Sequence, residues 1–201
     1  MDNSIPEAFI FMKVGWHGGE CLEKIVKRKQ REVNDVGMAF WGYGGTVLHP
    51  MNQVQPFVEK WKEESVCIEV LMEEIEGDSK AGPPAGTAKQ FAVSYKELVN
   101  DEGLWKRIPK GIKTGGEYAL VLDEIRECKL ELDLRDYEVG IGPSSKSKKN
   151  AADYLSYRTD KGALVKARST RNRPRESKRV QIKYRAYLKH PYAVFLWPLK
   201  K

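Results

Sequence analysis

The sequence predicts an α+β domain built on a mixed, mainly antiparallel sheet, with about three helices and a C-terminal β-hairpin; a barrel-like sheet is compatible with the pattern. Three observations lead to this fold class. Apolar runs of strand length outnumber helical repeats by about eight to three, the C-terminal part alternates between apolar and polar residues, and there is no internal repeat. A chain of 201 residues buries roughly 70% of its unfolded surface, so it needs no disulfides to form a core.

The first elements follow from apolar patterning in the N-terminal part. Residues 8–14 form an apolar run that predicts a buried strand. Residues 20–36 place their apolar side chains on one helical face, and Gly37 is the expected C-terminal stop. A second helix is expected to start near Gln55, because Pro56 is tolerated in the first turn of a helix but not in its interior.

The middle of the chain is predicted to contain mostly strands separated by polar loops. The clearest loop covers residues 77–87, and residues 142–149 form a second loop that is polar and basic, which we name the basic loop. Asn150 is expected to cap a short helix that continues to about Tyr157. Strands are expected at residues 65–75, 90–95, 117–125, 130–134 and 137–141.

The C-terminal part combines a basic stretch with two apolar runs. Residues 166–179, which we name the basic arm, carry seven positive charges and almost no apolar side chain, a composition that by itself is typical of disorder. Residues 180–188 then alternate between apolar and polar positions, and residues 192–197 form a second apolar run after a break at residues 189–191. We expect these two runs to form the C-terminal hairpin, which makes the basic arm a tethered segment rather than a free tail.

Charge is divided unequally along the chain. Residues 143–201 contain 17 basic and 3 acidic residues, a net charge of +14, whereas residues 1–142 contain 18 basic and 25 acidic residues, a net charge of −7. We therefore describe residues 1–142 as an acidic α+β body. Residues 143–201, which contain the basic loop, the short helix, the basic arm and the hairpin, complete the same domain. This asymmetry favours a polyanionic partner; the alternative is that the basic part packs against its own acidic body.

The leading functional hypothesis is that the basic part binds nucleic acid. The planar fork of arginine suits bidentate phosphate contacts, and the Ser, Thr and Asn residues among the cations are further donors for phosphate oxygens. The candidate contact residues are Lys166, Arg168, Arg171, Arg173, Arg175, Lys178, Arg179, Lys183 and Arg185. The alternatives are an adaptor role, in which the basic part recognises an acidic protein partner, and a solubilising loop that binds nothing.

A second hypothesis places a nucleotide or cyclic nucleotide at two Gly-rich stretches that contain aromatic residues and histidines. Backbone amides beside glycines can approach a phosphate closely, and Trp or Tyr rings can stack on a base. Such a pocket would hold the nucleotide or hydrolyse a phosphodiester. The candidate residues are Trp16, His17, Trp41, Tyr43, Gly44, Gly45 and His49. The alternative is that the rings belong to the core, since neither stretch matches the P-loop or the dinucleotide-binding pattern.

The sequence gives no pattern for a metal or cofactor site, and we expect neither. His17 and Cys21 are four residues apart and would share one face of a helix that began before them, with His49 as a third zinc ligand. However, Gly18 and Gly19 disfavour that early start, and no fourth ligand is evident. The acidic residues at 73, 74, 76 and 78 are interpreted as a solvated strand end. No motif specifies a reaction, so the sequence does not assign an enzymatic activity.

Cysteine usage and hydropathy bear on location. The three cysteines form no C-x-x-C pair and are expected to be core thiols in a reducing compartment. No apolar run reaches the roughly 20 residues of a membrane span, and the N-terminus lacks the pattern of a signal peptide. We therefore expect a cytoplasmic protein without a membrane partner.

Overall fold

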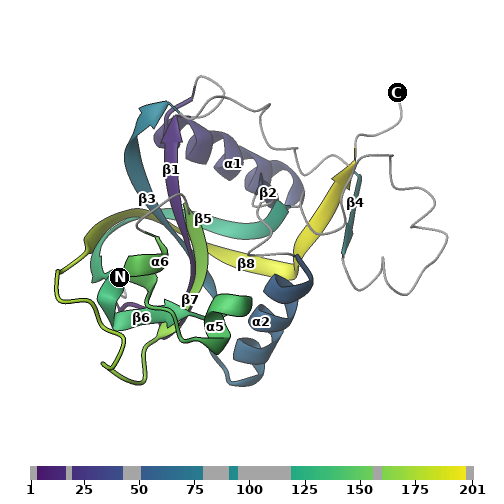
Figure 1. Ribbon diagram of the computed structural model, residues 1–201. Coiled ribbons are helices and arrows are strands. Elements are labelled where there is room, and N and C mark those ends of the chain that lie inside the picture. Colours follow the sequence, from purple (N-terminus) through teal and green to yellow (C-terminus); the bar gives the residue numbers. More distant parts are fainter. Residues whose placement is uncertain are drawn as a thin grey trace.

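The chain folds around one strongly curved sheet (Figure 1). The computed structural model describes residues 4–16, 20–42, 51–78, 91–94, 119–155 and 160–197. Its elements are β1 (Ala8–Trp16), α1 (Leu22–Val36), β2 (Ala39–Gly42), α2 (Met51–Glu63), β3 (Glu69–Asp78), β4 (Phe91–Ser94), β5 (Ala119–Asp133), the 3₁₀ turn η1 (Leu134–Asp136), β6 (Tyr137–Val139), α5 (Pro143–Lys146), α6 (Ala151–Tyr154), β7 (Lys161–Lys166) and β8 (Arg179–Trp197).

The sheet is mixed and mainly antiparallel, as predicted. Its strands follow the order β2-β5-β8-β3-β1-β7-β6, and β4 pairs with β8 beside this path. Among the described strands, β1 and β3 pair in parallel and every other pairing is antiparallel. Strand β5 leads through η1 directly into β6 at the far end of the order, so the sheet curls strongly. It does not close into a barrel, because the described parts of β5 and β6 do not pair.

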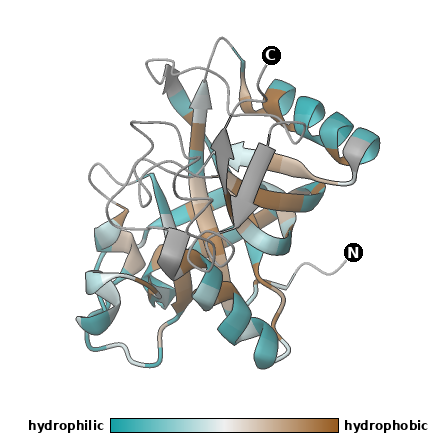
Figure 2. Cartoon of the chain, turned by 90° about the vertical axis from the view of Figure 1, so that its right-hand side faces the viewer, coloured by the Kyte–Doolittle hydropathy of each residue, from teal (hydrophilic) through white to brown (hydrophobic). Residues whose placement is uncertain are grey.

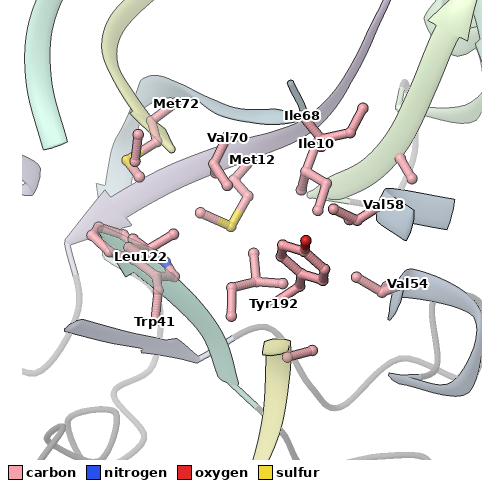
Figure 3. Packing of buried hydrophobic residues seen from close by; sticks show 14 of the residues in the cluster. Ile10, Met12, Trp41, Val54, Val58, Ile68, Val70, Met72, Leu122 and Tyr192 are labelled. Atoms are coloured by element: carbon pink, nitrogen blue, oxygen red, sulfur yellow. The ribbon is translucent and has the colours of Figure 1, made fainter. Parts of the chain in front are cut away.

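Each face of the sheet carries its own hydrophobic core. Side chains of β1 alternate between the two: Ile10 and Met12 belong to the first core, which packs under α1 and α2 (Figure 3), and Phe9 and Phe11 belong to the second, which packs against η1 and α6. In Figure 2 the hydrophobic residues gather on the strands in the middle of the molecule, with hydrophilic residues on the helices and loops around them. A buried strand between two cores explains why residues 8–14 are almost continuously apolar.

The predicted C-terminal hairpin is wrong, because both apolar runs belong to the single strand β8. Both halves of β8 pair with β5: Leu188 is opposite Leu122, and Ala193 is opposite Leu120. Four residues, 189–192, therefore stand opposite one residue of β5, so the break is a large bulge and not a turn. The buried Gln55 of α2 stabilises this bulge, since its Nε2 donates to the carbonyl oxygens of residues 191 and 193 at 2.6 and 2.8 Å.

A second irregularity in β8 changes which side chains face which core. Met72 pairs with Tyr184, whereas the next residue of β3, Glu73, pairs with Ile182, so Lys183 is bulged out of the ladder. As a result Ile182 packs in the second core, although Ala186, which has the same parity in the sequence, packs in the first. The even alternation of residues 180–188 predicted one apolar face, and the bulge divides these residues between two cores.

Other boundaries also differ from the sequence-based expectations. The predicted strands at residues 117–125 and 130–134 are the single strand β5, and the basic loop contains the short helix α5. Helix α2 begins at Met51, so Pro56 lies inside the helix, where it cannot donate a backbone hydrogen bond to residue 52. Strand β7 was not predicted.

Two local predictions are confirmed. Gly37 ends α1 in the left-handed conformation, with a φ of 76°, and its N–H donates to the carbonyl of Val33. Asn150 caps α6, since its side-chain oxygen accepts a hydrogen bond from the N–H of Ala152. The helix ends at Tyr154, and residues 156–159 lie outside the described residues.

Gly140, just after β6, is predicted to be intolerant of any side chain. A Cβ atom at this position would lie 2.8 Å from Cε2 of Phe57 and 3.0 Å from Cγ1 of Val165. The substitution Gly140→Ala is expected to lower the free energy of unfolding by about 1–3 kcal/mol, as overpacking does, measured by urea denaturation.

The matching control is a double-mutant cycle with Phe57→Leu, which removes the ring that the new methyl group would meet. The double variant should lose less free energy of unfolding than the sum of the losses in the two single variants. Additive effects would contradict this packing.

Candidate functional site

The basic arm is a closed loop whose two ends meet at η1 (Figure 1, between β7 and β8). At its start, the N–H of Ala167 donates to the carbonyl of Asp136 at 2.8 Å, and at its end the carbonyl of Lys178 accepts from the N–H of Leu134 at 2.9 Å. The arm also contains a turn in which the N–H of Arg173 donates to the carbonyl of Thr170. The arm is therefore tethered, as expected.

The carboxylate of Asp133 fixes the returning half of the arm. It accepts hydrogen bonds from the Arg135 guanidinium at 2.6 and 2.9 Å, from Ser177 Oγ at 2.8 Å and from the N–H of Lys178 at 3.3 Å. Nη1 of Arg135 in turn donates to the carbonyl of Arg175 at 3.0 Å. The hydrogen bonds from Arg135 hold the pKa of Asp133 well below its usual value, so this network of charge-assisted bonds persists at neutral pH.

The tip of the arm is joined to the basic loop. Nδ2 of Asn172 donates to the carbonyl of Lys148 at 3.2 Å, and Arg173 forms an ion pair with Asp136 at 2.5 Å. The exposed lysines of the basic loop, Lys146, Lys148 and Lys149, therefore belong to the same basic surface as the arm. The charge pattern of the sequence alone did not point to these three lysines as contact residues, because their proximity to the arm comes from the fold.

Eight of the nine predicted contact residues divide into two groups, and Lys178 belongs to neither. Lys166, Arg168, Arg171 and Arg175 are exposed, and in the part of the chain that the structure describes no carboxylate lies within ion-pair distance of them. In contrast, Arg173 pairs with Asp136, Arg179 with Glu131, Lys183 with Glu74, and Arg185 with Glu69. Lys178 is half-buried at the base of the arm.

Arg185 faces inward, although its position in the sequence alternation suggested an outward side chain. Its side chain is 6% exposed, and Nε donates to Oε2 of Glu69, whose side chain is 7% exposed, at 2.6 Å. The bulge at Lys183 reverses the faces of β8, so Arg185 stands opposite Leu71 of the second core. A buried guanidinium that is bound to a carboxylate cannot reach a large polyanion.

Lys13, Glu73 and Lys178 form a half-buried cluster that the sequence reading missed. Nζ of Lys13 donates to the carbonyl of Leu155 at 2.6 Å, whereas Oε2 of Glu73 is buried without a hydrogen-bond partner. Burial lowers the pKa of Lys13, and the charge of Lys178 lowers it further. Burial raises the pKa of Glu73, and both lysines act in the opposite direction. Glu73 is therefore not part of a solvated strand end, as the sequence had suggested, because it lies beside the base of the arm.

Perturbed acid and amine groups often mark catalytic sites, but this cluster is better placed to hold the arm. The Oε2 atom is shielded from solvent and the Lys13 ammonium is engaged by a backbone carbonyl. Lys13 and Glu73 are register partners on β1 and β3, and the charge of Lys178, the last residue of the arm before β8, acts on the pKa of both.

The residues of the predicted nucleotide pocket are only partly described. Trp41 is 7% exposed and belongs to the first core (Figure 3), so its ring is covered by protein. Trp16 is 48% exposed at the end of β1, in register with Asp78. The remaining candidates lie outside the described residues: His17, Tyr43, Gly44, Gly45 and His49.

The described residues offer no metal site and no membrane-spanning helix. In the ranges given above, no three His, Cys, Asp or Glu side chains come together in a way that could hold a metal ion. Within the same ranges, no helix has the length and apolar character needed to cross a bilayer. The expectation of core thiols is wrong for Cys67, which is exposed, whereas Cys21 and Cys128 are half-buried.

A scan against protein-family models finds no match to this chain, and searches of curated proteins and of solved structures return no similar protein.

The raised pKa of Glu73 predicts that the free energy of unfolding depends on pH. The folded chain keeps the Glu73 proton at pH values where the unfolded chain has lost it, so this group lowers stability as pH rises above its ordinary pKa of 4.5. The substitution Glu73→Gln removes the effect. The difference in unfolding free energy, variant minus wild type, should become more positive between about pH 4.5 and 7, measured by urea denaturation across a pH series.

The matched control is Glu76→Gln, because Glu76 is an exposed residue of the same strand. The difference in unfolding free energy between Glu76→Gln and the wild type should stay constant across the pH series. If the same difference also stays constant for Glu73→Gln, the burial of the Glu73 carboxyl group is contradicted.

Proposed function

We propose that this protein binds nucleic acid through the basic arm and the adjoining basic loop. One observation carries the proposal: Lys166, Arg168, Arg171 and Arg175 are exposed without a carboxylate partner among the described residues, on a loop whose ends are fixed. Guanidinium groups on a fixed loop suit phosphate oxygens, which accept bidentate hydrogen bonds from arginine.

The polar side chains of the arm have a different role from the one expected. Asn172 and Ser177 hold the loop in place through Lys148 and Asp133, and Ser169 Oγ accepts from the N–H of Arg171. In this proposal the phosphate contacts come from the cations, and the small polar residues position them.

Three cations of β8 are less suited to phosphate contacts than the cations of the arm. Arg179, Lys183 and Lys189 of β8 each have a carboxylate partner, namely Glu131, Glu74 and Asp123. Exposed ion pairs contribute little to stability, but they reduce the field that these cations present to a ligand. A cytoplasmic location is part of the proposal, because none of the three cysteines forms a disulfide.

The experiment is a salt series with fluorescence anisotropy on a labelled DNA duplex. If the four arm cations and the three lysines of the basic loop each meet a phosphate, affinity should fall about 10³- to 10⁴-fold between roughly 50 and 200 mM salt. In the triple variant Arg168→Gln, Arg171→Gln, Arg175→Gln it should fall only about 100-fold over that range, and binding at the lower salt concentration should be much weaker.

The control carries the same change in charge. The triple variant Arg179→Gln, Lys183→Gln, Lys189→Gln removes three cations that have carboxylate partners, and its salt slope should stay close to that of the wild type. Equal slopes for the two triple variants would contradict the proposal. Binding to an acidic protein, with no binding to nucleic acid, would favour the adaptor hypothesis and overturn it.

A further inference from the structure

We infer that the ligand of this basic surface is a duplex, held by its phosphates and independently of base sequence, rather than a single strand. This inference rests on the proposed function and specifies its ligand. It follows from the side chains that the surface lacks, from the way the arm is fixed and from the presence of two basic segments side by side.

The basic arm and the basic loop, both within the described residues, supply cations but no aromatic platform. Proteins that bind single strands stack the exposed bases on aromatic side chains in addition to contacting the backbone. Neither the basic arm nor the basic loop contains a Phe, Tyr or Trp residue. A single strand bound here would leave its bases unstacked, whereas in a duplex the bases are already stacked on each other.

The two described aromatic residues that border the surface, Tyr137 and Tyr154, pack in the second core. Tyr137 is 6% exposed and packs edge-to-face on Phe9, with the ring centroids 4.9 Å apart. Tyr154 is 5% exposed and lies beneath Lys149, whose Nζ is 5.8 Å from the ring centroid. Burial raises the pKa of both tyrosines to about 12. Their ring faces are thus covered and cannot receive a base.

The exposed Trp16 does not supply the missing platform. It is in register with Asp78 on β3, the strand that also carries Glu74 and Glu76. Acidic residues on this neighbouring strand disfavour phosphates at this end of β1.

The fixed arm matches a ligand whose phosphates are also fixed. Its cations are held by the Asp133 network, by the Arg173–Asp136 ion pair and by the Asn172 contact with the basic loop. The regular backbone of a duplex presents phosphates at constant spacing and high charge density. A flexible single strand would have to lose conformational entropy to match the same positions.

Two basic segments lie side by side on this surface. Arg168 and Arg171 belong to the arm, Lys146 and Lys148 belong to the basic loop, and the Asn172–Lys148 hydrogen bond joins the two segments. A duplex offers two phosphate strands that border a groove, so each segment can meet one strand. Contacts of this kind fix position without reading base sequence.

The test compares a labelled DNA duplex with each of its separated strands, using the wild-type chain and fluorescence anisotropy at one low salt concentration. The duplex should bind at least about tenfold more tightly than either strand, and a duplex of permuted sequence should bind within about twofold of the first. A strand that binds as tightly as the duplex, or a strong dependence on base sequence, would overturn the inference.

The triple variant Arg168→Gln, Arg171→Gln, Arg175→Gln separates this inference from the proposed function. If the strand binds best and the triple variant weakens that binding, the surface binds nucleic acid and only the duplex preference is wrong. If the triple variant binds every probe as the wild type does, or if no probe binds the wild type, the proposed function itself fails.

Discussion

The carboxylate of Asp133 is the point on which the position of the basic arm depends. It lies at the end of β5, where one side chain receives hydrogen bonds from Arg135 in η1 and from Ser177 and Lys178 in the arm. A stretch with seven positive charges and hardly any apolar side chain has no core of its own to hold it. Charge-assisted hydrogen bonds to one anion replace that core and keep the cations in fixed positions.

The curvature of the sheet brings the partners of this network together. Strand β5 passes through η1 into β6, so the start of β8 and the end of β7, which carry the two ends of the arm, meet at the same turn. The bulge at Lys183 lets the long strand β8 contribute side chains to both cores, and the bulge at residues 189–192 lets it continue along β5. The bulge at Lys183 also turns Arg185 inward, where it is buried with Glu69, while the cations of the arm are exposed.

Local sequence signals predicted the features that depend on a few neighbouring residues. Gly37 and Asn150 act within one turn of helix, and the sequence identified both. The hairpin was predicted wrongly because a bulge and a turn look alike in sequence; the choice depends on the length of β5 and on Gln55, which is distant in the chain. For the site, the sequence identified the cations of the arm, but it could not tell which of them have carboxylate partners. It gave no signal for Asp133, one polar residue of an alternating strand pattern, because the importance of Asp133 comes from tertiary contacts.

The most direct test of this account uses two protein variants, each of which removes one negative charge from the end of β5. The affinity of each variant for a labelled DNA duplex is measured and compared with that of the wild type. Simple electrostatics predicts tighter binding for both Asp133→Ala and Glu131→Ala, because each makes the protein more positive. If Asp133 fixes the arm, Asp133→Ala should weaken binding by about tenfold through lost preorganisation, while Glu131→Ala, which releases Arg179, should bind as tightly as the wild type or slightly more tightly. Equal or tighter binding of the folded Asp133→Ala variant would contradict the account.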